Sequence, residues 1–231
     1  MTDPVRYRLE GTTAIVEMDD GKANALSDTM IAALLAALDR AESEARAVVL
    51  AGRPDRFCAG FDLRVMMSGP DNARALLKTG SELLLRLYAA TVPLVVACTG
   101  HALAGGALVV LTGDLRVAAA GAYRIGLNEV AIGLPVPVLA MELARDRLQP
   151  AALTQATLLA RIYDPESARA AGYVDEVVAP DQVLPRALAE ATRLSELGAV
   201  PFAATKRRLR ERTIRCIRDS MDTDLLALLP S

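Results

Sequence analysis

The segment Leu87–Gly113 contains no Lys, Arg, Asp or Glu, so most of it has to be removed from water. Its length alone would allow a membrane-spanning helix. Pro93 and the glycine pair Gly105 and Gly106 interrupt the segment, and such residues disfavour one continuous helix. We therefore interpret it as a buried strand, "PLVVACTG", followed by a glycine turn and a buried helix. A transmembrane helix is the disfavoured alternative.

The overall composition limits the classes of function. The 231 residues suffice for one large α/β domain, or for a core with a small C-terminal addition, and 52% are hydrophobic. The net charge of −2 argues against general nucleic-acid binding. The three cysteines are far apart, so neither a disulfide framework nor a zinc site is expected. Since "MTDPVRYRLEG" has no apolar signal core, we expect a cytoplasmic protein with no membrane partner. A bound metal is not expected either.

Apolar periodicity predicts alternating strands and helices. "VRYRLE" alternates apolar and charged residues as a half-buried strand does, and Ser27 is suited to cap the first helix. Strands are expected at 5–10, 13–19, 46–52, 93–98, 114–121, 123–127 and 173–179; helices are expected after 27, at about 71–90, 136–146, 150–159 and 165–171, and mainly after 180. This order predicts an α/β fold with helices packed over a sheet.

The glycine pair Gly105 and Gly106 follows a predicted strand and opens a predicted helix. Glycine permits close approach of a ligand to the backbone, and the first N–H groups of a helix have no partner within it. The pair is therefore a candidate donor site for an oxygen that becomes negative. Tight packing of the strand against the helix explains the glycines equally well at this stage.

A second small-residue turn lies upstream, where Ala59 and Gly60 follow the strand "RAVVLAG" and precede a predicted helical turn. An ordinary strand–helix connection is the simpler explanation for this turn alone. Two such turns after separate strands could, however, point backbone N–H groups at one oxygen.

The chain resembles a known family at four motifs. "CAGFDL", "GHALAGGALVVLTGDLRVAA" and "GLNEVAIGLP" have the order and spacing of the enoyl-CoA hydratase/isomerase family, the crotonases, and "GKANALS" resembles its N-A-L segment. The resemblance runs from about Val5 to Val178. It implies an α/β crotonase-like superhelix of stacked β-β-α units at 1–180, which binds acyl-CoA and catalyses, and a C-terminal helical region at 181–231 with oligomer contacts. A homotrimer or a dimer of trimers is implied.

In this family two backbone N–H groups bind the thioester oxygen of an acyl-CoA while an enolate forms, and the matching positions are Ala59 and Gly105. One well-placed donor of this kind contributes a few kcal/mol in the transition state. Glu129 matches a family glutamate, and its apolar neighbours are expected to raise its pKa and make it a better base. A second glutamate, used by the hydratases of the family, is replaced here by Leu108.

The resemblance implies further contacts with the substrate. The expected substrate-binding residues are Lys22, Ala23, Ala25, Gly60, Phe61, Asp62, Leu63, Gly106, Leu108 and Lys206. Lys206 belongs to the basic run "KRRLRERTIRCIR" and is the best candidate in it for the CoA phosphates. A solvated helix face is the alternative for the run as a whole.

One glutamate rather than two favours a double-bond shift, because a single base can move a proton from the α to the γ carbon. The pattern of leucine and then glutamate resembles the 3,2-trans-enoyl-CoA isomerases most closely. A hydratase that uses Glu129 alone, and an acyl-CoA binding protein without activity, remain alternatives. CoA would be part of the substrate, so no separate cofactor is expected.

Three other polar residues are assigned no chemistry. His101, the only histidine, is expected to have a structural or pocket-wall role, and Asp114 a structural one. Cys58 borders the first turn, but no base is paired with it in the sequence, so it is not expected to be a nucleophile.

Overall fold

A six-stranded sheet forms the centre of the computed structural model, which describes residues 3–228. Its strands follow the spatial order β1 (Val5–Glu10), β2 (Thr13–Met18), β3 (Ala47–Ala51), β5 (Leu94–Cys98), β7 (Leu115–Ala119) and β9 (Glu176–Val178). The β1–β2 pair is antiparallel and all other neighbours are parallel. Parallel neighbours need crossover connections, and the chain supplies helices for most of them.

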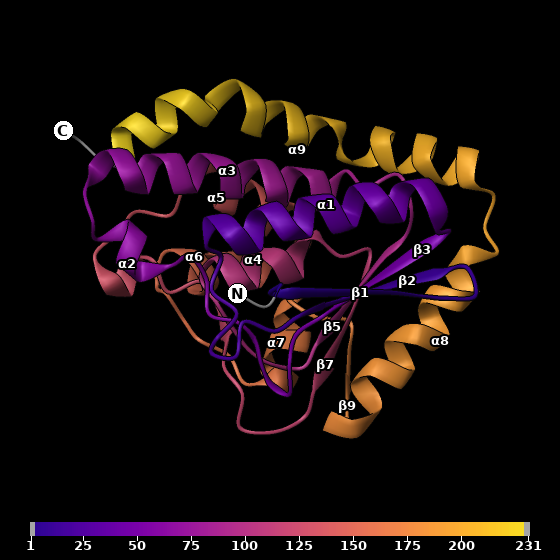
Figure 1. The fold of residues 1–231 in the computed structure, drawn as a ribbon. Helices are drawn as coiled ribbons and strands as arrows, with labels where there is room; N and C mark the ends of the chain where they lie inside the picture. The colour runs from indigo at the N-terminus through magenta and orange to yellow at the C-terminus, as the bar shows by residue number, and fades with distance from the viewer. Residues whose placement is uncertain (1–2, 229–231) are drawn as a thin grey trace.

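Both faces of this sheet are covered by helices (Figure 1). On β3, Val48 and Leu50 belong to the core that includes residues of α1 (Asp28–Glu44) and α3 (Pro70–Tyr88). The alternating residue Val49 belongs to a second core, formed with α8 (Val183–Ser195). Burial on both faces explains why the central strands are apolar throughout rather than alternating.

A second, three-stranded parallel sheet consists of β4 (Asp55–Cys58), β6 (Gly100–Leu103) and β8 (Ile125–Gly126). The prediction was wrong for β4 and β6, which it assigned to turns. Both strands are four residues long, "DRFC" and "GHAL", and neither contains a β-branched residue. Pairing between the strands, rather than local propensity, therefore explains this sheet.

The remaining helices pack around the two sheets. They are α2 (Leu63–Met66), α4 (Gly105–Thr112), α5 (Val138–Arg147), α6 (Leu153–Thr157), α7 (Pro165–Ala171) and α9 (Ala199–Leu228), with short 3-10 turns η1 (Val130–Ile132), η2 (Pro150–Ala152) and η3 (Pro180–Gln182). Every residue of α4 is buried, as the sequence predicted for this uncharged helix. Across residues 3–228, no helix is both long enough and apolar enough to cross a bilayer.

The long helix α9 crosses over α3 and also contacts α5 (Figure 1). A buried ionic cluster fixes it there: the Asp114 carboxylate, just after α4, accepts from the Lys206 ammonium at 2.7 Å and forms an ion pair with the Arg210 guanidinium at 2.9 Å. Arg210 also donates to the carbonyl oxygens of Tyr88 and Thr112. Asp114 therefore has the structural role that the sequence analysis assigned to it.

Candidate active site

Three loops converge at one edge of the small sheet. Because β4, β6 and β8 are parallel neighbours, their carboxyl ends lie at the same edge. Phe61 follows β4 by three residues, Gly105 follows β6 by two, and Glu129 follows β8 by three. This edge is the usual location for a ligand site in an open parallel sheet. The topology thus brings together chain segments that are far apart in sequence.

The two glycines at the start of α4 have different roles. A Cβ on Gly106 would lie 2.0 Å from the carbonyl oxygen of Cys58, so glycine is required there for close packing of α4 on β4. Gly105 is the first residue of α4, and no acceptor for its N–H is found within residues 3–228. The packing explanation therefore holds for Gly106, and the N–H of Gly105 is left available to a ligand.

The residue before α4 has an unusual backbone. Ala104, the N-cap, adopts φ 48° and ψ −123°, a conformation that non-glycine residues rarely adopt. Its N–H donates to the carbonyl of Gly126 at 3.0 Å, which ties the start of α4 to β8. Such strain persists where the surrounding structure fixes the backbone, and it is common at functional sites.

The prediction that Ala59 supplies an oxyanion donor is wrong. Its N–H already donates to the carbonyl of Ala23 at 3.0 Å. Leu26 pairs with the next segment, since its N–H donates to Gly60 and its carbonyl accepts from the N–H of Asp62. The intervening N–H of Phe61 points the opposite way, and none of residues 3–228 accepts from it. Phe61, rather than Ala59, therefore carries the free N–H on this turn.

The Phe61 and Gly105 backbones lie beside each other. A Cβ on Gly60 would be 3.2 Å from the Gly105 nitrogen, which places the two turns in contact. The Phe61 ring lies against two glycines, because a Cβ on Gly105 would be 3.0 Å from its Cε2 and one on Gly80 of α3 only 2.1 Å from its Cε1. Two adjacent free N–H groups can bind one negatively charged oxygen.

Asn24 supports the Phe61 turn and was not singled out from the sequence. Its side chain is fully buried, and its Nδ2 donates to the carbonyl oxygens of Met18, Arg56 and Phe57 at 3.0–3.1 Å. Asn24 also has a left-handed φ of 53°. It therefore joins its own loop to β2 and β4. The signal available in the sequence was the single amide side chain between the alanines of "GKANALS".

Glu129 is the carboxylate at this edge of the sheet. It is 8% exposed, and its Oε2 is buried without a hydrogen-bond partner in the part of the chain that the structure describes. Burial raises the pKa of this carboxyl, as the sequence predicted. The hydroxyls of Tyr163 and Tyr173 are likewise buried without a partner there. An unpartnered basic oxygen of this kind is available to accept a proton from a ligand.

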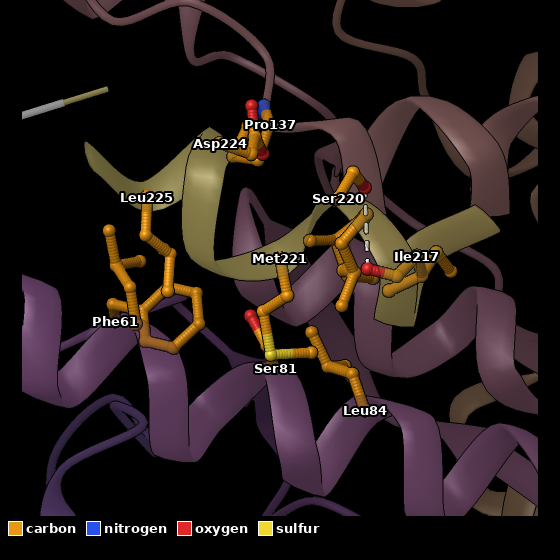
Figure 2. Close-up of a pocket in the computed structure, with 12 residues that line it drawn as sticks. Phe61, Ser81, Leu84, Pro137, Ile217, Ser220, Met221, Asp224 and Leu225 are labelled. Atoms are coloured by element: carbon orange, nitrogen blue, oxygen red, sulfur yellow. Dashed lines mark hydrogen bonds between the residues drawn. The ribbon is translucent and has the colours of Figure 1, made fainter. Parts of the chain in front are cut away.

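Leu108 lies one turn after Gly105 and is 3% exposed. It lines a cavity of about 30 Å³ (Figure 2). The other lining residues are Phe61, Leu77, Ser81, Leu84, Pro137, Leu139, Ile217, Ser220, Met221, Asp224 and Leu225. Because Phe61 and Leu108 lie near the two donors, this mainly apolar cavity borders the candidate reaction site.

The other residues expected to contact the substrate lie in the Asn24 loop and at the start of α2. Ala23 and Ala25 lie in the loop held by Asn24, where the Ala23 carbonyl accepts from the N–H of Ala59 and the N–H of Ala25 donates to the Asp20 carboxylate. Their contact with the substrate stays a prediction. Asp62 caps α2 by accepting from the N–H of Arg64. Lys22 and Leu63 are exposed, Leu63 at 66%, and neither lines the cavity. A substrate contact for these two residues stays a prediction.

Lys206 does not have the surface position that a phosphate contact requires. It is 6% exposed, and its ammonium is paired with Asp114. Burial lowers its pKa to about 8, although Asp114 acts in the opposite direction. The expectation that Lys206 binds CoA phosphates is therefore wrong: Lys206 belongs to the buried face of α9, with Arg210, Thr213 and Ile217.

His101 and Cys58 have the roles expected of them. The His101 Nδ1 accepts from the N–H of Arg124, and its ring packs edge-on against Tyr123. Burial raises the pKa of the Cys58 thiol to about 12, which keeps it protonated and unreactive. Within residues 3–228, no cluster of His, Cys, Asp and Glu could hold a metal ion.

Comparisons with known proteins identify the family to which this chain is similar. The profile of the enoyl-CoA hydratase/isomerase family matches residues 8–224. Human mitochondrial enoyl-CoA delta isomerase 1 is 32% identical over 220 residues, which cover 92% of this chain and 72% of the human protein. A putative enoyl-CoA hydratase from Thermus thermophilus is 34% identical over 205 residues, covering 85% of this chain and 80% of that protein.

A solved structure extends the likeness to the whole fold. The crystal structure of an enoyl-CoA hydratase/isomerase family protein from Pseudomonas syringae superimposes with a TM-score of 0.96 at 37% identity, and the match covers 98% of this chain and 99% of that one. The crotonase-like fold predicted from the motifs is thereby confirmed. From the family profile, the relatives and the shared fold together, this chain belongs to the enoyl-CoA hydratase/isomerase family.

Proposed function

We propose that the protein is an enoyl-CoA isomerase that converts 3-enoyl-CoA into 2-enoyl-CoA. The observation that carries the proposal is the single buried carboxyl of Glu129, with one oxygen unpartnered among the described residues, at the same sheet edge as two free N–H groups. Leu108 stands where the hydratases of the family have a second glutamate. One base and an oxyanion site suffice for a proton shift.

In the proposed reaction, Glu129 removes a proton from the α carbon of 3-enoyl-CoA. The C–H electrons form a new double bond to the carbonyl carbon, and the thioester oxygen becomes negative. The N–H groups of Phe61 and Gly105 donate to this oxygen and lower the energy of the enolate. Glu129 then returns the proton to the γ carbon, so that the double bond lies between the α and β carbons and the base is regenerated.

The surroundings of the base support this role. Burial favours the protonated form of Glu129, which brings its pKa closer to neutrality and makes the carboxylate a stronger base. The apolar cavity beside Leu108 offers no second carboxylate close to the base that would hold a water for addition, since Asp224 in its wall is on α9 and hydrogen-bonded to Val138. CoA is part of the substrate in this proposal, and no separate cofactor is needed.

The product distribution tests the proposal. The purified protein would be incubated separately with 3-enoyl-CoA and 2-enoyl-CoA, and the products identified by mass spectrometry and chromatography. We expect conversion of the first substrate to 2-enoyl-CoA, with hydration of the second much slower. Faster hydration would favour a hydratase that uses Glu129 alone, as the name of the Thermus relative suggests. Binding without turnover would favour an acyl-CoA binding protein.

We also propose a cytoplasmic location. It is supported by Cys58, Cys98 and Cys216, all of which are unpaired thiols, as is typical of a reducing compartment.

A further inference from the structure

The cavity in Figure 2 connects the candidate reaction site to helix α9. Phe61, which carries one oxyanion donor, and Leu108, one turn after the other donor, form part of its wall. Ile217, Met221 and Leu225 from α9 form another part. An apolar chain attached to a thioester held by the two donors would therefore extend toward α9.

The cavity is too small for a long chain as it stands. Its volume of about 30 Å³ is room for about two water molecules, which is well short of a long alkyl chain. Figure 2 shows the Met221 side chain projecting from α9 toward Ser81 of α3, across this space. Methionine is unbranched and flexible, so this side chain can rotate and admit a few more carbons.

The helix itself is held in place at this point. The Asp224 carboxylate accepts from the N–H of Val138, the first residue of α5, at 2.7 Å. Nearby, the Lys78 ammonium on α3 lies 3.0 Å from the carboxylate of Asp222. Because the Asp224 bond joins α9 to α5 at this point, while the exposed Lys78–Asp222 pair adds little, rotation of the Met221 side chain is the easier source of extra room.

We propose that Met221 limits the length of the acyl chain, so that the enzyme prefers short enoyl-CoA substrates. The proposal deepens the function proposed above and rests on it for the reaction. The chemical class of the substrate is a CoA thioester whose acyl chain ends against the Met221 side chain. Replacing Met221 by a smaller residue lengthens the cavity, and replacing it by a larger one shortens it.

The test compares the wild type with Met221→Ala, Met221→Trp and the control Leu226→Ala. Leu226 is on the same helix, is 59% exposed and does not line the cavity. For each variant, kcat/KM would be measured with 3-hexenoyl-CoA and 3-dodecenoyl-CoA. The dissociation constants of hexanoyl-CoA and dodecanoyl-CoA, which contain no double bond to shift, would be measured by calorimetry.

We expect the wild type to favour the six-carbon substrate. Met221→Ala should raise the ratio of twelve-carbon to six-carbon kcat/KM at least about tenfold, which is the usual scale for one methylene in an apolar pocket. Met221→Trp should weaken binding of hexanoyl-CoA, and Leu226→Ala should match the wild type. Chain-length ratios that are the same in all four proteins would overturn the proposal.

The binding measurements separate this proposal from the proposed function. If no 3-enoyl-CoA is converted, but the affinities for the saturated thioesters still change with residue 221, then the isomerase reaction fails and the chain-length role stands. Circular dichroism of each variant confirms that the comparison is between folded proteins.

Discussion

Glu129 is the residue on which the proposed chemistry depends, and Glu129→Gln keeps its shape while removing its basicity. We expect isomerisation to fall by at least about a hundredfold, the usual scale for a general base, with acyl-CoA affinity retained. In the wild type, kcat/KM should fall as the pH drops through the raised pKa of Glu129, above the usual range of a glutamate. Turnover close to normal in the variant would identify another base.

The same substitution has a measurable effect on stability. A carboxyl whose pKa is raised in the folded state opposes folding when it is ionised, at every pH above its unfolded value. Glu129→Gln should therefore have a higher melting temperature than the wild type at neutral pH. The difference should shrink as the pH falls below the folded pKa and disappear in strong acid. This behaviour serves as the control that the variant is folded.

Ala104, immediately before α4, has a strained backbone. Glycine adopts its combination of φ 48° and ψ −123° much more readily than alanine does. We expect Ala104→Gly to stabilise the protein by about 1 kcal/mol, since the relieved strain exceeds the added entropy of the unfolded chain. Urea denaturation measures this, and kcat should stay within about twofold. A loss of stability would mean that the alanine methyl group has a packing role.

In our proposal, Leu108 disfavours hydration of the double bond, because it supplies no second carboxylate to hold a water. A glutamate at this position would give a second carboxylate beside the Phe61 and Gly105 donors, where it can hold a water. Leu108→Glu should raise the rate of 2-enoyl-CoA hydration relative to isomerisation. The gain will be limited, because a buried carboxyl is costly and its pKa would rise. An unchanged ratio of the two rates, measured on folded protein, would count against the isomerase proposal.

Among the helices, α9 is held in place by a buried ionic cluster in which two cations, Lys206 and Arg210, share one carboxylate, Asp114. Asp114→Asn would leave Lys206 and Arg210 buried without their common partner, and we expect a loss of about 3–5 kcal/mol. Lys206→Met leaves the Arg210 pair intact, so its cost should be within about 1 kcal/mol. Urea denaturation compares the two variants.

The Lys206→Met variant also tests the correction made for this residue. Because the ammonium is buried against Asp114, its removal should leave acyl-CoA affinity unchanged. A large loss of affinity, with stability intact, would restore the phosphate-binding role that the basic run suggested.

The sequence predicted those elements whose signal is local. The apolar runs of β3 and β5, the cap at Ser27, and the helix Pro165–Ala171 all appear where they were expected. Two of the three strands of the small sheet, β4 and β6, were missed because they gain their stability from pairing with each other. Long-range pairing of this kind leaves little trace in four consecutive residues.

At the scale of the whole molecule, we propose that the protein assembles as a trimer or a dimer of trimers. Large apolar side chains are exposed on the single chain, among them Leu158, Leu159 and Val200, and contact between copies would cover some of them. Light scattering should give three or six times the chain mass of 24.5 kDa over a range of concentrations. A mass equal to one chain would contradict the proposal.

The whole fold also decides which residues of the site could be predicted. Glu129 and Gly105 could be named as candidates, because each lies in a long, distinctive motif, and both lie at the candidate site. The other donor was placed at Ala59 instead of Phe61, two positions away, because the direction of an N–H depends on which strand pairs with which. Lys206 was misplaced for a similar reason: a basic run does not reveal which of its members lies inside.

The contact between Phe61 and Gly80 has a consequence for how this protein would tolerate mutation. A methyl group at position 80 would lie 2.1 Å from the Phe61 ring and displace it, and the same residue carries the N–H that we propose as an oxyanion donor. In a saturation mutagenesis screen, position 80 would therefore be as intolerant as the active-site positions, although it lies in the middle of α3. A second-site replacement of Phe61 by a smaller side chain would restore the room, so suppressors of Gly80→Ala should arise at residue 61.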